Sequence, residues 1–230
     1  MNNQIYAVVV AAGLTAVSYG IGLGVGWITE VNWLEAFSVF TSYWCTYLCV
    51  FQSRWNYIIG AISVSALCLL FWQGNLLSSM ALQVYLFPTL LYGWWRWRED
   101  DNTRPVTFIN WKWYPAYIGL TAVVGYACMW VNTYFGGTNG GWDTTVLVLS
   151  ILAQFMMDNK KLENWLVWII VDTISVPLYW GQGLNILSIQ MGLFGLNAVW
   201  GLYMWWKTYK SPDYLEWVDQ FPHYSISQES

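Results

Sequence analysis

Eight long apolar runs are the feature that most constrains how this chain can fold. They are Ile5–Ile28, Leu34–Phe51, Tyr57–Trp72, Leu76–Trp97, Trp113–Phe135, Trp142–Met157, Trp165–Trp180 and Leu184–Trp206. About 20 predominantly apolar residues cross the hydrocarbon core of a bilayer as a helix. The Trp residues at the ends of the shorter runs suit the headgroup region and extend the effective span. The sequence therefore predicts an all-α polytopic membrane protein with eight transmembrane helices.

The composition agrees with this prediction and excludes other classes of protein. Of the 230 residues, 57% are hydrophobic and 10% are charged, whereas soluble domains carry about 25% charged residues. A soluble protein of this size could not bury so much apolar surface. The formal net charge of −4 offers no basic surface for phosphates, so we expect a lipid bilayer and no nucleic acid as partner.

The cysteines do not predict a metal site. Cys45, Cys49, Cys68 and Cys128 lie inside apolar runs, form no CxxC pair, and have no His cluster beside them, since the single His is His223. We interpret them as small apolar residues that pack or face lipid, and we expect neither a metal ion nor a cofactor. Without a His base or paired midplane carboxylates, the chain also lacks the groups for acid–base catalysis, so an enzyme is not expected.

The basic residues predict the orientation of the helices. All nine Lys and Arg residues lie at or after the end of an even-numbered apolar run, and the connections after odd-numbered runs contain none. Lys and Arg are retained on the cytoplasmic side of membrane proteins. We therefore expect both termini to lie in the cytoplasm.

Two stretches of the chain resemble each other at an offset of about 108 residues. Trp55-Asn56-Tyr57 matches Glu163-Asn164-Trp165, and Tyr92–Trp97 matches Trp200–Trp205. Each stretch holds three apolar runs, which predicts two parallel three-helix repeats with a substrate site between them near the midplane; chance similarity among Trp-rich helices is the alternative. The predicted parts are an extra N-terminal helix (1–32), a first repeat with its cytoplasmic loop (33–110), a linker helix (111–141), a second repeat (142–210) and a cytoplasmic tail (211–230).

The same stretches resemble the PnuC family of bacterial vitamin B3 transporters. The resemblance runs roughly from Trp33 to Lys207. The residues that carry it are Trp33-x-Glu35-Ala36, Asn56, Gln83-Val84, Tyr92-Gly93-Trp94-x-x-Trp97, Trp142-Asp143, Glu163-Asn164-Trp165, Ile174-Ser175-Val176, Gln182-Gly183 and Asn197. The resemblance implies a SWEET-like 3+1+3 arrangement in the bacterial inner membrane, to which the first helix is an addition.

The resemblance also implies a transport function. It implies facilitated diffusion (uniport) of nicotinamide riboside into the cytoplasm for NAD synthesis, followed by trapping through a cytoplasmic nicotinamide riboside kinase. Another cationic aromatic vitamin, such as thiamine, is the alternative substrate. Proton-coupled symport through Asp172 is the alternative mechanism, and assembly into a homo-oligomer is left open.

Polar side chains at membrane depth are costly and are therefore candidates for substrate binding. Asp172 lies midway along its run and can complement a positive pyridinium ring; a role in helix packing is the alternative. Gln190 and Asn197 are seven residues apart and so share one helix face, and Gln83 lies at a similar depth on the fourth run. Their amides suit a carboxamide or ribose hydroxyls, with interhelical hydrogen bonding as the alternative.

Three aromatic residues complete the predicted site. Trp168 lies four residues before Asp172 on the same helix face, where an indole can stack on a cationic ring. Trp44 and Tyr47 on the second run are the predicted opposing walls. For each of them, simple packing is the alternative.

Overall fold

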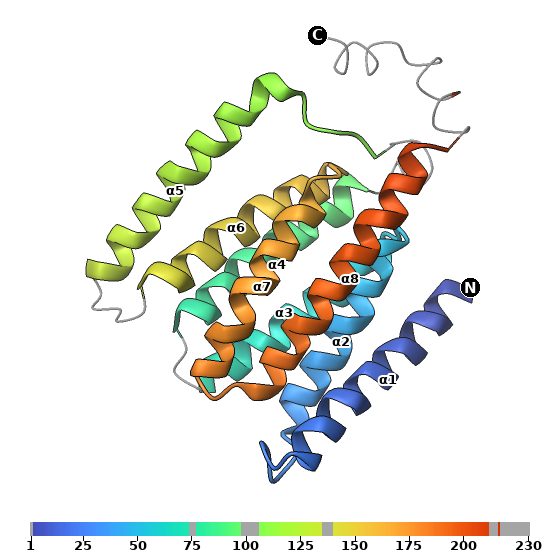
Figure 1. Cartoon of the computed structure of the whole chain (residues 1–230), viewed down its shortest axis with the longest axis vertical. Helices are drawn as coiled ribbons and strands as arrows, with labels where there is room; N and C mark the ends of the chain where they lie inside the picture. Colours follow the sequence, from blue (N-terminus) through green and yellow to red (C-terminus); the bar gives the residue numbers. More distant parts are fainter. Residues whose placement is uncertain (1, 74–76, 98–105, 135–139, 212–215, 217–230) are drawn as a thin grey trace.

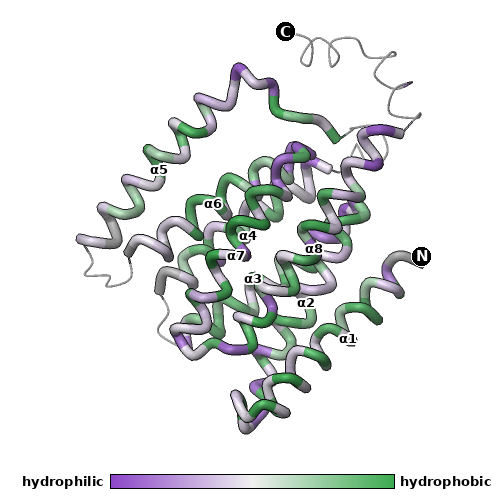
Figure 2. The backbone as a smooth tube through the Cα atoms, in the orientation of Figure 1, coloured by the Kyte–Doolittle hydropathy of each residue, from purple (hydrophilic) through white to green (hydrophobic). Residues whose placement is uncertain are grey.

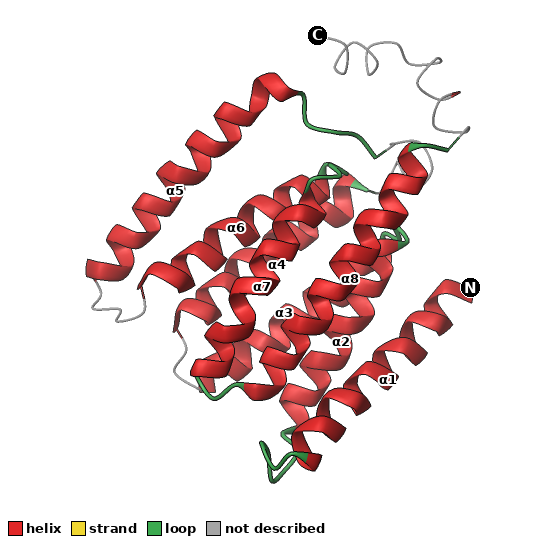
Figure 3. Ribbon diagram, viewed as in Figure 1, coloured by secondary structure: helices red, strands yellow, loops and turns green. Residues whose placement is uncertain are grey.

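The computed structural model describes residues 2–73, 77–97, 106–134, 140–211 and 216 (Figure 1). The helices in this part are α1 (Asn2–Gly24), α2 (Trp33–Val50), α3 (Trp55–Gln73), α4 (Leu77–Arg96), α5 (Tyr114–Tyr134), α6 (Gly140–Asp158), α7 (Asn164–Gly181) and α8 (Asn185–Tyr209), with a 3₁₀ turn at Trp111–Trp113. Each predicted run corresponds to one helix, and Figure 3 draws no strand among the described residues. The expectation of an all-α, eight-helix fold is confirmed.

The hydropathy of the helices fits a membrane. Figure 2 shows hydrophobic residues mixed with residues of intermediate hydropathy along the helices, and strongly hydrophilic residues near several helix ends. By length and hydropathy alone, three described helices can cross a bilayer, namely Gln4–Gly24, Trp55–Gln73 and Asn185–Tyr209. Of the remaining helices, α2, α4, α5 and α7 are rich in Trp and Tyr, which suit the membrane interface although they are less hydrophobic than aliphatic residues. The helix α6 contains a shorter apolar stretch, Thr144–Asp158.

The helices α2 and α6 end in the same type of backbone turn. Gln52 and Lys160 both have a positive φ, of 53° and 49°, and lie 108 positions apart. In each turn, the backbone N–H of the following residue donates a hydrogen bond to the carbonyl five residues before it. Ser53 donates to Leu48 at 3.0 Å, and Lys161 donates to Met156 at 2.9 Å. This is a Schellman-type helix end, and it sends the chain directly into the following helix.

The bundle consists of two helix triplets that contact each other at their edges. We call α2–α4 the first triplet and α6–α8 the second triplet. Neighbouring helices pack within each triplet, and the contacts between the triplets run from α2 to α8 and from α4 to α6. In Figure 1, α1 lies at one edge of the bundle, against α2 and α8, and α5 lies at the opposite edge, against α6.

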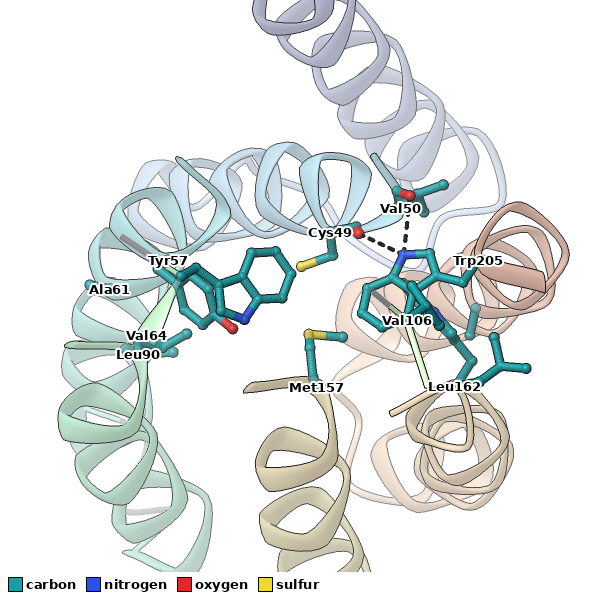
Figure 4. Close-up of a cluster of buried hydrophobic side chains, with 13 residues drawn as sticks. Cys49, Val50, Tyr57, Ala61, Val64, Leu90, Val106, Met157, Leu162 and Trp205 are labelled. Carbon is teal, nitrogen blue, oxygen red and sulfur yellow. Dashed lines mark hydrogen bonds between the residues drawn. The ribbon is translucent and has the colours of Figure 1, made fainter. Parts of the chain in front are cut away.

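Two indole N–H groups tie the triplets together at the end of the bundle where α2 and α6 terminate. The Trp97 Nε1–H donates to the carbonyl of Asp158 at 3.1 Å. The Trp205 Nε1–H donates to the carbonyls of Cys49 and Val50, both at 3.2 Å (Figure 4). Trp97 and Trp205 lie 108 positions apart, as do Val50 and Asp158. The two triplets therefore bind each other through equivalent residues.

Candidate functional site

A cavity of about 200 Å³ lies between the two triplets. The described residues that line it come from α2, α3, α4, α6, α7 and α8, and none comes from α1 or α5. Most of the wall is apolar, and no Lys, Arg or His is among these lining residues. The cavity can therefore accept an apolar or cationic ring far more readily than an anion.

One wall of the cavity, on α7, is more polar than the equivalent wall on α3. On α7 the lining residues are Trp165, Trp168, Val171, Asp172, Ser175 and Tyr179. On α3 they are Gly60, Ser63, Val64, Leu67 and Phe71, which lie 108 positions before the last five of the α7 residues. A bound molecule would thus meet a carboxylate on α7 and, apart from the Ser63 hydroxyl, an apolar surface on α3.

Asp172 is the acidic residue of the polar wall. Its side chain is 4% exposed, and within the described chain no hydrogen-bond donor or cation lies on its carboxylate. Burying an ionised carboxylate without a partner is costly. A cationic ligand in the cavity would offset that cost, since the carboxylate lines the same space.

The side-chain amide of Gln190 is buried and has no partner in the described part of the chain. The residue is 1% exposed, and neither its Oε1 nor its Nε2 atom has a hydrogen-bond partner there. The indole Nε1 of Trp168 is likewise buried and unpaired. Because nearly all buried polar atoms in folded proteins are paired, these groups are suited to a polar ligand that brings its own donors and acceptors.

Other polar groups of the cavity are already paired. The hydroxyls of Ser42 and Ser63 are 2.6 Å apart, and the Asn197 Nδ2 atom lies 3.4 Å from the carbonyl of Thr46. Gln83 is 6% exposed and also lines the cavity. The hydroxyl pair can exchange partners with a ligand hydroxyl at little cost, because each hydroxyl both donates and accepts.

The structure brings five of the seven predicted site residues to one cavity. These are Gln83, Trp168, Asp172, Gln190 and Asn197. The remaining two, Trp44 and Tyr47, are not part of its lining.

Trp44 and Tyr47 face away from the cavity because of the helical period of α2. Their neighbours Cys45 and Thr46 line it, so positions one residue away point elsewhere. The Trp44 indole donates to Gln4 Oε1 of α1 at 3.3 Å. The Tyr47 ring packs on the ring of Trp200, with centroids 5.6 Å apart. The prediction that both aromatics form a wall of the site is therefore corrected.

Sequence reasoning missed a stripe of small residues on α2 and a buried acid. Ser42, Cys45, Thr46 and Cys49 all line the cavity, and their spacing of three and four residues could have identified them as one helix face. Asp158 is 2% exposed at the end of α6. Its Oδ1 accepts hydrogen bonds from the Tyr57 hydroxyl at 2.9 Å and the Gln154 amide at 2.8 Å. Gln154 lies one turn earlier on the same helix, but Tyr57 comes from a distant segment, so the sequence alone does not reveal this pairing.

Comparison with known proteins identifies relatives over most of the chain. A family model described as nicotinamide mononucleotide transporter matches residues 32–207. The nicotinamide riboside transporter PnuC of Escherichia coli K12 is 28% identical over 205 residues, covering 76% of this chain and 86% of the relative. The riboflavin/roseoflavin transporter RibM of Streptomyces davaonensis is 26% identical over 162 residues, covering 67% of this chain and 76% of the relative.

A solved structure has the same fold. The crystal structure of the vitamin B3 transporter PnuC superposes with a TM-score of 0.76 at 18% sequence identity, covering 91% of this chain and 96% of that chain. This likeness covers more of the chain than the residues 32–207 that the family model matches.

Proposed function

Because the chain belongs to the nicotinamide mononucleotide transporter family, we propose that it carries nicotinamide riboside across the bacterial inner membrane. The family consists of membrane transporters rather than enzymes. The relative from Escherichia coli is named for nicotinamide riboside. This substrate combines a flat cationic ring, a carboxamide and a ribose.

The observation that carries the proposal is the buried carboxylate of Asp172 beside the unpaired indole of Trp168, in a cavity whose described lining contains no basic residue. A positive pyridinium ring complements this carboxylate and can stack on the indole, a contact worth about 2 kcal/mol when desolvated. The mononucleotide adds a phosphate to the same molecule. That negative charge would be buried near Asp172 without a cation, so the nucleoside is favoured over the nucleotide.

The remaining polar groups suit the rest of the substrate. The amide of Gln190 lacks partners and can pair with the carboxamide. The hydroxyl pair of Ser42 and Ser63, with Asn197 and Gln83, suits the ribose. The substrate would then span from the polar α7 wall to the first triplet.

We further propose uniport by alternating access. Rocking of the two triplets against each other would expose the cavity to either side in turn. A cytoplasmic nicotinamide riboside kinase would trap the product, and both termini would lie in the cytoplasm. A homo-oligomer is compatible with this scheme, because the cavity is lined from within one chain.

A second substrate class has its own support. RibM, named as a riboflavin/roseoflavin transporter, is a relative over 67% of this chain, so a larger flavin is a candidate alongside thiamine. Proton-coupled symport through Asp172 is the second mechanism, because this carboxylate is buried in the proposed pathway.

The test is calorimetric binding to the purified protein, followed by uptake into proteoliposomes. We expect binding of nicotinamide riboside, and no comparable binding of the mononucleotide, thiamine or riboflavin. Asp172→Asn should weaken binding of the cationic riboside by roughly tenfold, about 1.4 kcal/mol. It should leave binding of the uncharged dihydro form of the riboside unaffected. Tight binding of riboflavin, or binding of the mononucleotide as tight as that of the riboside, would overturn the assignment of nicotinamide riboside as the substrate. Uptake that requires a proton gradient would overturn uniport.

A further inference from the structure

Sulfur atoms gather on the inner wall of the cavity. Of the four free cysteines, Cys45 and Cys49 line the cavity, and Met157 lines it as well. The proposed transport mechanism uses none of these sulfur atoms. We propose that Cys45, Cys49 and Met157 form a binding site for one soft, thiophilic metal cation of the Hg²⁺ class, and that the bound cation blocks the cavity.

The positions of the three side chains allow them to share one ligand. Cys45 and Cys49 are four residues apart on α2, which puts their side chains on one face about one turn apart. Met157 comes from the last turn of α6. In Figure 4 the side chains of Cys49 and Met157 extend into the same space between α2 and α6, and both belong to one buried cluster.

The surroundings leave the sulfur atoms available. The Cys45 thiol donates to the carbonyl of Asn56 at 3.3 Å, and Cys49 interacts with Cys45 and, electrostatically, with Asp158. A thiol is a weak donor, so exchanging these contacts for a metal bond costs little.

Ligand chemistry selects the class of metal. Thiolate and thioether sulfur prefer soft cations. When Hg²⁺ binds, each thiol loses its proton and forms an S–Hg bond, so two protons leave and the two thiolates neutralise the ion. A neutral complex suits an apolar cavity. Zn²⁺ prefers four ligands from Cys, His and carboxylates, and the described residues contain no group of three such side chains.

The test uses a protein in which only the cavity thiols remain. In a Cys68→Ala/Cys128→Ala background, the other two cysteines, which are absent from the cavity lining, no longer compete. We expect titration with HgCl₂ to saturate at one Hg²⁺ per protein, with a thiolate-to-mercury absorbance band and release of two protons. Two Hg²⁺ per protein, or no binding, would overturn the proposal, because the thiols would then act separately or be inaccessible.

Matched variants separate chelation from single-thiol binding. In this background, Cys45→Ser should make the protein lose Hg²⁺ more readily to a competing monothiol. Met157→Leu should weaken Hg²⁺ binding by about tenfold, the scale on which supporting residues of metal sites act. A Cys45→Ser protein that holds Hg²⁺ as well as its parent would contradict the shared site. Circular dichroism checks that each variant is folded.

The prediction that Hg²⁺ inhibits uptake rests on the proposed function, whereas the prediction that Hg²⁺ binds does not. Stoichiometric Hg²⁺ should stop uptake by the background protein, and bound nicotinamide riboside should slow the reaction with Hg²⁺. Undiminished uptake by a mercury-loaded protein would overturn the claim that the site blocks the cavity. Because stoichiometry and proton release are read without any transport assay, a wrong substrate assignment leaves the binding result intact.

Discussion

The indole of Trp97 donates a hydrogen bond to the backbone carbonyl of Asp158 at 3.1 Å. This bond crosses from the first triplet to the second. Trp97 is 1% exposed, and its equivalent Trp205, which is fully buried, makes the matching bond to the end of α2. In the predicted topology both bonds lie on the cytoplasmic side, where they hold the triplets together in this conformation.

Trp97→Phe should therefore loosen this end of the bundle. The change removes one buried donor and keeps most of the aromatic volume, so we expect a loss of about 1 kcal/mol in the free energy of unfolding. Trp205→Phe should cost a similar amount because its bonds are equivalent. Thermal unfolding of the purified variants measures both. If neither variant is less stable, the two indole bonds do not hold the triplets together.

Gly201→Ala should destabilise the protein strongly. A Cβ atom at Gly201 would lie 2.6 Å from the Trp165 ring, and that ring is 3% exposed and cannot move aside easily. Overpacking of this kind costs about 1–3 kcal/mol. Gly93→Ala should also destabilise the protein, since its Cβ atom would collide with the buried Tyr57 ring.

The matched control for the glycine change is Gly20→Ala in α1. A Cβ atom there meets nothing within 4 Å, and Ala is a better helix former than Gly. We expect the melting temperature of Gly20→Ala to stay level or rise. Equal destabilisation by Gly20→Ala and Gly201→Ala would show that close packing is not the cause.

Gln190→Leu should weaken substrate binding without weakening the fold. Neither amide atom has a partner among the residues that the structure describes, so an apolar side chain of similar size removes no hydrogen bond seen there. Loss of a ligand hydrogen bond corresponds to about 1–2 kcal/mol, or roughly 5- to 30-fold in Kd. Calorimetry measures the change in Kd, and thermal unfolding measures the stability of the variant. A variant that binds normally but unfolds at a lower temperature would assign Gln190 a structural role instead.

Trp168→Leu and Trp44→Leu should differ in their effect on binding. Trp168 lines the cavity and Trp44 does not, so we expect only Trp168→Leu to raise the Kd for the cationic riboside, by roughly tenfold, about 1.4 kcal/mol. Trp44→Leu should instead weaken the contact between α1 and α2, because its indole donates to Gln4. Normal binding by Trp168→Leu, measured by calorimetry, would exclude the proposed stacking on this indole.

Part of the candidate site was accessible from the sequence. Asp172, Gln190 and Gln83 were identified because polar residues inside long apolar runs stand out, and all three line the cavity. The prediction for Trp44 and Tyr47 rests on their position along the second run and not on a helix face. Depth along a helix does not specify which side of it faces inward, and a shift of one residue rotates a side chain by about 100°.

The eight helices follow from the sequence alone. An apolar run of bilayer length is a property of neighbouring residues, so it does not depend on distant parts of the chain. Three features follow from the packing of distant helices: which helix faces meet at the cavity, that Gln190 has no partner among the described residues, and that Asp158 pairs with Tyr57. These features depend on how the two triplets pack against each other, and packing is a property of residues brought together from far apart in the chain.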